Sequence, residues 1–101
     1  MGRRHKLDVI FEILSLAQGG VRRTRLVYLT NINFSMLRRY LNVLFRMGLI
    51  EDRGKVLVTT PKGVRFVEEY DEFTSKWNFY EEFERVKQRR EEPVVTISQY
   101  V

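Results

Sequence analysis

Four polar side chains recur at helical spacing near the middle of this sequence. They are Ser35, Arg39, Asn42 and Arg46. At roughly 100° per residue they share one face of a helix, and Arg38 lies at the edge of that face. Arginine can hold guanine or a phosphate through two parallel hydrogen bonds, and asparagine can hold adenine in the same way. The pattern predicts a surface that a nucleic acid could contact as one unit.

Composition argues against catalysis. The 101 residues include no cysteine and a single histidine, His5, which excludes thiolate zinc sites and argues against a histidine metal site or a catalytic triad. There is no phosphate-binding glycine loop, and the carboxylates have no convergent spacing. We therefore expect no enzyme, no metal and no cofactor, and no small-molecule ligand is evident. No apolar run is long enough to span a bilayer, and the absence of cysteine fits a reducing cytoplasm.

The net charge of +5 is divided unevenly along the chain. Residues 1–60 hold 11 basic and 4 acidic side chains, a balance of +7, whereas residues 61–101 hold 7 and 9, a balance of −2. No acidic residue lies between Gly19 and Ile50. A polyanion is therefore the expected partner of the first sixty residues, and the last forty have another role.

Further basic residues fall on two other expected elements, the start of a second helix and the turn of a hairpin. The complete set expected to bind DNA is Arg22, Arg23, Arg25, Ser35, Arg38, Arg39, Asn42, Arg46, Arg53 and Lys55. Backbone N–H groups at a helix start also favour a phosphate. Arg3, Arg4 and Lys6 could add a basic arm. The alternative for any one of these elements is an ordinary solvated face.

Periodicity and turn signals predict the elements that carry these residues. Helices are expected over residues 7–17, 23–30 and 34–47, with Asn33 or Ser35 capping the third. Two β-prone runs around a glycine-containing turn predict a hairpin over residues 49–59. The fold class is mainly α with a small β-hairpin: a winged helix-turn-helix over residues 1–60, followed by a long C-terminal dimerisation helix over residues 61–90 and a tail over residues 91–101.

The third helix has an inner and an outer face. Leu37, Leu41 and Leu44 form the inner line and are expected in the core. Met36 and Val43 flank the outer face, where they could touch a thymine methyl group or meet a neighbouring element.

Large aromatic residues follow the hairpin at heptad spacing. Phe66, Tyr70, Phe73, Trp77 and Tyr80 step by four and three residues, and Phe83 follows three residues later. Exposed, they would form a larger apolar strip than soluble proteins normally tolerate. We therefore expect a homodimer through these six residues, in parallel or antiparallel orientation. Thr74-Ser75 could instead split the helix in two.

The sequence resembles a large family of small archaeal winged-helix proteins. The residues that carry the resemblance are Thr30-Asn31-Ile32-Asn33-Phe34, Leu37-Arg38-Arg39-Tyr40-Leu41, Gly48-Leu49-Ile50-Glu51 and Thr59-Thr60-Pro61-Lys62-Gly63. This family includes chromatin-associated DNA-binding proteins that dimerise through a C-terminal helix, and presumed transcription regulators. The resemblance implies a homodimer without a cofactor that contacts DNA through its third helix and wing.

The function expected from the sequence is therefore double-stranded DNA binding by a dimeric transcriptional regulator or chromatin protein. The third helix would enter the major groove, and the hairpin would contact the backbone or minor groove. The alternative is a winged-helix protein–protein interaction module within a larger assembly.

Overall fold

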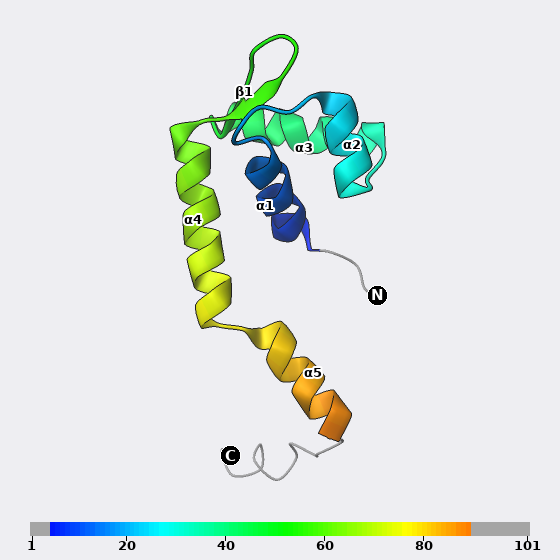
Figure 1. Cartoon of the computed structure of the whole chain (residues 1–101), viewed down its shortest axis with the longest axis vertical. Coiled ribbons are helices and arrows are strands. Elements are labelled where there is room, and N and C mark those ends of the chain that lie inside the picture. Colours follow the sequence, from blue (N-terminus) through cyan, green and yellow to red (C-terminus); the bar gives the residue numbers. More distant parts are fainter. Residues whose placement is uncertain (1–4, 90–101) are drawn as a thin grey trace. The chain divides into compact units, whose positions relative to one another are not determined.

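The structure, a computed structural model, describes residues 5–89 and the side chains of residues 5–87 (Figure 1). The chain divides into two compact units, with the boundary after Asp71. The elements are α1 (Lys6–Leu16), α2 (Arg23–Thr30), α3 (Phe34–Arg46), β1 (Ile50–Asp52), β2 (Leu57–Thr59), α4 (Pro61–Lys76) and α5 (Phe79–Arg89). The expected order of three helices and a hairpin is confirmed. The tail over residues 91–101 lies outside the described residues, as do Arg3 and Arg4.

The core of the first unit, which we call the winged-helix unit, is formed by α1, α2, α3 and the hairpin. Its buried apolar residues are Val9, Ile13, Leu14, Ala17, Val21, Leu26, Leu37, Leu41, Leu44, Leu49, Ile50 and Leu57. The inner line expected for α3 is confirmed. In α1 the buried face is centred on Val9 and Ile13, whereas Leu7 is exposed.

The hairpin is held to the helices by a third segment. β1 and β2 pair antiparallel, with Ile50 opposite Thr59 and Asp52 opposite Leu57. Val21, between α1 and α2, exchanges two backbone hydrogen bonds of 3.0 and 2.8 Å with Leu57. Because Val21 directly precedes Arg22, this pairing fixes the start of α2 beside the hairpin.

The beginning of α4 is tied closely to the end of α3. Thr60 caps α4 by accepting the Gly63 N–H at 3.1 Å, and its hydroxyl donates to the Gly48 carbonyl at 2.7 Å. A Cβ atom at Gly63 would lie 2.6 Å from Cγ2 of Thr59 and against the Leu49 carbonyl. Only glycine therefore permits this close approach of the helix.

Two aromatic residues of α4 pack inside the winged-helix unit. The Tyr70 ring lies 5.0 Å from Phe11 of α1 and 5.6 Å from Phe66. The Tyr70 hydroxyl donates a hydrogen bond to Asp8. Phe66 and Tyr70, which the heptad spacing assigned to a dimer interface, are thus half-buried within the winged-helix unit of their own chain.

The C-terminal helical segment is interrupted at Trp77 and Asn78. Asn78 caps α5, because its side chain accepts the Glu81 N–H at 3.2 Å and donates to the Glu81 carboxylate at 2.7 Å. The sequence left open whether residues 61–90 form one helix. The structure has two helices, and the break lies two residues beyond Thr74-Ser75.

No helix within residues 5–89 combines the length and the apolar character needed to cross a membrane.

Candidate nucleic-acid interface

A short turn sets the direction in which α3 leaves α2. Asn31 ends α2 in the left-handed conformation, with a φ of 61°, and its N–H donates to the Val27 carbonyl at 3.0 Å. Asn33 then caps α3, because its side-chain oxygen accepts the Met36 N–H at 2.7 Å. Asparagine suits both roles, since it tolerates positive φ and its short side chain reaches the helix N-terminus. Of the two expected caps, the structure uses Asn33.

The outer face of α3 brings the expected polar residues together in solvent. Its exposed polar residues are Ser35, Arg38, Arg39, Asn42 and Arg46. Within residues 5–87, none of these three arginines forms an ion pair or a side-chain hydrogen bond. Because α3 contains no acidic residue, its positive charge is not neutralised locally. The surface can donate hydrogen bonds to an external anion.

At the start of α2, one of the three basic residues has an acidic partner. Arg23 donates to Asp52 at the end of β1 over 2.8 Å, whereas Arg22 and Arg25 are exposed and form no ion pair in the described chain. The Arg23 guanidinium and the backbone N–H of Gly54 hold the pKa of Asp52 below its usual value. This pair joins α2 to the wing, which is the hairpin of β1 and β2.

The wing carries a second pair of this kind. Arg53 donates to Oε2 of Glu51 from Nε at 3.0 Å and from Nη2 at 2.7 Å. Lys55, in the same turn, is exposed and unpaired among the residues that the structure covers. Although the sequence between Gly19 and Ile50 lacks acids, the strand that follows supplies Glu51 and Asp52. Two of the ten expected DNA-binding residues are therefore partly neutralised within the chain.

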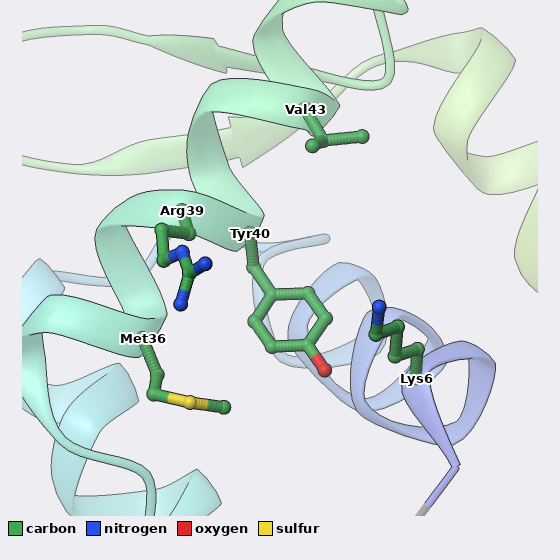
Figure 2. Close-up of a pocket in the computed structure, with 5 residues that line it drawn as sticks. All are labelled: Lys6, Met36, Arg39, Tyr40 and Val43. Carbon is green, nitrogen blue, oxygen red and sulfur yellow. The ribbon is translucent and has the colours of Figure 1, made fainter.

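Two hollows flank the outer face of α3. One, of about 230 Å³, is lined by Arg23 of α2 and by Phe34, Leu37, Arg38, Leu41, Asn42 and Phe45 of α3. The other, of about 260 Å³, is lined by Lys6 of α1 and by Met36, Arg39, Tyr40 and Val43 (Figure 2). Lys6, which the sequence placed in a basic arm, is the first residue of α1 and lines this hollow together with Arg39.

The second unit, which we call the C-terminal unit, exposes the remaining residues of the expected dimer interface. They are Phe73, Trp77, Tyr80 and Phe83, and the structure adds Phe79 and Val86 to the exposed apolar set. The Trp77 and Phe79 rings stack at 6.4 Å, and the Lys76 ammonium lies 5.7 Å from the Trp77 ring. Phe79 lies off the heptad line that the sequence predicted, and Val86 follows Phe83 by three residues. On α5, Phe79, Phe83 and Val86 step by four and three residues and share a face.

Within residues 5–89, no three histidine or acidic side chains lie close enough together to hold a metal ion.

Comparison with known proteins shows the family of the chain. An uncharacterised protein from Methanocaldococcus jannaschii is 30% identical over 71 residues, which are 69% of this chain and 34% of that protein. The chain thus spans about a third of the length of this relative. The crystal structure of Sso10a-2, a DNA-binding protein from Sulfolobus solfataricus, shares the fold with a TM-score of 0.69 at 24% identity, over 88% of this chain and 99% of that one. A sequence profile of the winged helix-turn-helix family matches residues 3–78, and the chain belongs to this family.

Proposed function

We propose that this protein binds double-stranded DNA without catalysing a reaction, with α3 in the major groove. The observation that carries the proposal is the outer face of α3, where Arg38, Arg39 and Arg46 are exposed and unpaired within residues 5–87. The major groove of B-DNA admits an α-helix, and its base edges accept hydrogen bonds from arginine and asparagine. The shared fold with Sso10a-2, a DNA-binding protein, supports this proposal.

The other basic residues then contact the sugar–phosphate backbone. Arg22 and Arg25 at the start of α2 and Lys55 in the wing are available as they stand. Arg23 and Arg53 would exchange their carboxylate partners for phosphates. Both pairs are exposed to solvent, where ion pairs contribute little to stability, so this exchange costs little. Contacts of this kind set the position of the protein on DNA but do not read its sequence.

The protein acts as a homodimer in this proposal, and the second copy covers the apolar surface of the C-terminal unit. We define this surface by Phe73, Trp77, Phe79, Tyr80, Phe83 and Val86, whose exposed fractions range from 40% to 71%. Six large apolar side chains exposed within fourteen residues exceed what an isolated soluble chain normally shows. Two winged-helix units joined in this way would bind one duplex with avidity.

The cellular role is transcriptional regulation or chromatin organisation at the nucleoid in the cytoplasm. Selecting bound sites from random duplexes distinguishes the two roles. A defined motif with fixed half-site spacing indicates a regulator, whereas an absence of sequence preference indicates an architectural protein.

The DNA-binding proposal is tested by a mobility-shift titration with a mixed-sequence duplex at physiological salt. The doubly substituted Arg39→Ala, Arg46→Ala variant should bind at least about tenfold more weakly, because it loses two charge-assisted contacts. Arg65→Ala is the matched control, since it removes an exposed arginine of α4 outside the proposed interface. Unchanged binding by the double variant would refute this docking face. No shift of the wild-type protein at micromolar concentration would favour the alternative, an interaction module that meets an acidic protein.

A further inference from the structure

Apolar side chains are interleaved with the arginines on the outer part of α3. Met36 and Val43 are 38% and 47% exposed, although both are apolar. Val43 follows Arg39 by four residues and precedes Arg46 by three, so it lies between the two on the helix surface. The sequence offered two roles for Met36 and Val43. The structure shows that no neighbouring element among the described residues buries them.

The hollow beside these residues combines apolar walls with positive charge. Met36, Val43 and the Tyr40 ring supply the apolar lining, and Arg39 and Lys6 supply two cations. In Figure 2 the Tyr40 ring lies between Arg39 and Met36 on one side and Lys6 of α1 on the other. The hollow suits a partner that presents a small apolar group close to an anion. In the major groove, the 5-methyl group of thymine meets this description because phosphates line the groove on both sides.

We infer that Val43 and Met36 contact thymine methyl groups, while Lys6 contacts a neighbouring phosphate, so that this face of α3 prefers A·T pairs over G·C pairs at the bases it covers. This inference rests on the proposed function, since it requires α3 to lie in the major groove. It goes further by naming the group that the apolar residues recognise.

Val43 must lie within the DNA interface if α3 docks through its arginines. Any docking that brings both Arg39 and Arg46 to the DNA also covers Val43 between them. An alkyl group placed over a base-edge donor or acceptor would remove water without replacing its hydrogen bond, which is unfavourable. Of the groups displayed in the major groove, only the thymine methyl is apolar. RNA is not the expected ligand, because uracil lacks this methyl group and the A-form major groove is too narrow to read.

The test compares two duplexes of one mixed sequence that contain either thymine or deoxyuridine throughout. The two pair identically and differ only in the 5-methyl group. Binding of the full chain is measured by fluorescence anisotropy at fixed salt. We expect about fourfold weaker binding to the deoxyuridine duplex for each methyl group that is buried, because a buried methylene-sized group contributes about 0.8 kcal/mol.

Variants assign the effect to the proposed residues. Val43→Ala combined with Met36→Ala should reduce the ratio of the two affinities to nearly one. Both positions are exposed and helical, and alanine favours helix, so circular dichroism should show an unchanged fold. Arg46→Ala is the control for a general loss of affinity, because it should weaken binding to both duplexes and leave their ratio unchanged.

Each outcome supports or overturns the inference. A wild-type preference for thymine that the double variant loses supports it. Equal binding of both duplexes by the wild type overturns it and leaves the proposed DNA binding intact. A preference that survives in the double variant overturns it as well, since the methyl groups are then read elsewhere. Failure to bind either duplex overturns the proposed function itself.

Discussion

The winged-helix unit and the C-terminal unit use the same kinds of side chain in opposite ways. In the first, apolar residues such as Leu37 and Leu44 are fully buried, and the arginines on the outer face of α3 are unpaired. In the second, Phe83 is 71% exposed, and Arg85 forms ion pairs with Glu81 and Glu82 at 3.3 and 2.8 Å. The winged-helix unit buries its central apolar cluster and leaves the arginines of α3 unpaired within residues 5–87, whereas the C-terminal unit exposes its aromatic rings and pairs Arg85 with carboxylates.

This difference indicates which kind of partner each unit would bind. Unpaired cations favour association with a polyanion, which is sensitive to salt. Exposed aromatic rings favour association with another apolar surface. The change occurs within α4, because Tyr70 packs against Phe11 of α1 and Phe66 packs against the core, while Phe73 remains exposed. The first part of α4 thus belongs to the buried core of the winged-helix unit, and its last part belongs to the exposed apolar surface of the C-terminal unit.

The largest predicted effect concerns the buried core of the winged-helix unit. Leu44→Ala should lower the free energy of unfolding by about 2–5 kcal/mol, because it leaves a cavity among side chains that are excluded from water. Urea denaturation followed by circular dichroism measures the change. Val43→Ala, at the adjacent exposed position, should stay within about 0.5 kcal/mol of the wild type. Equal losses in the two variants would contradict the assignment of the inner and outer faces of α3.

A smaller loss is expected where α4 joins the core. Gly63→Ala should lower the free energy of unfolding by about 1–3 kcal/mol, because the added Cβ would collide with the Leu49 carbonyl and with Thr59. In an open helix the same substitution would stabilise by up to about 1 kcal/mol. Gly19→Ala, which places its Cβ in open space, is the control in the same denaturation experiment. A Gly63→Ala variant as stable as the wild type would mean that α4 does not approach Leu49 and Thr59 so closely.

Substitutions in the exposed apolar surface of the C-terminal unit should weaken dimerisation and leave folding unchanged. Phe79→Ser combined with Phe83→Ser should weaken dimerisation at least about tenfold, since two large apolar side chains are lost from the proposed contact. Sedimentation velocity over a micromolar concentration series measures the shift from dimer to monomer. Tyr28→Ser removes an exposed aromatic ring of α2 and should leave the dimer intact. A wild-type protein that sediments as a monomer would contradict the dimer proposal.

The smallest predicted effect is a pH dependence within the winged-helix unit. Arg23 and the Gly54 N–H lower the pKa of Asp52, so the ionised carboxylate favours the folded state above the pKa that it has when unfolded. This small contribution is lost as the pH falls below about 4. Thermal unfolding at pH 7 and pH 3 should therefore show a slightly greater acid destabilisation for the wild type than for Asp52→Asn. Identical acid sensitivity would mean that the Arg23–Asp52 pair contributes nothing in solution.

Local signals in the sequence predicted the parts of the fold that depend on neighbouring residues. The bounds of α2, the cap at Asn33, the inner line of α3 and the start of α4 at Pro61 all follow from spacing and capping chemistry. The break before α5 had a signal of the same kind that the prediction did not use. Asn78 followed three residues later by Glu81 is the spacing of a capping box.

Contacts between residues distant in the sequence could not be predicted in this way. The pairing of Arg23 with Asp52 joins residues 29 apart, and the Val21–Leu57 bridge depends on how the hairpin folds back. For the same reason the heptad spacing could not show that Tyr70 packs on Phe11. Whether a charged or aromatic residue is available for a partner depends on such distant contacts. The spacing of residues therefore predicts candidate binding residues, and the structure shows which of them already have a partner within the chain.

In the proposed complex, the unpaired arginines of α3 contact the phosphates and base edges of DNA. The most direct measurement is the salt dependence of duplex binding by the wild type and by the Arg39→Ala, Arg46→Ala variant. A plot of log K against log salt concentration should be linear for the wild type, and the slope of the variant should be shallower by about one for each arginine that contacts a phosphate. Equal slopes and equal affinities of the two proteins would contradict the account.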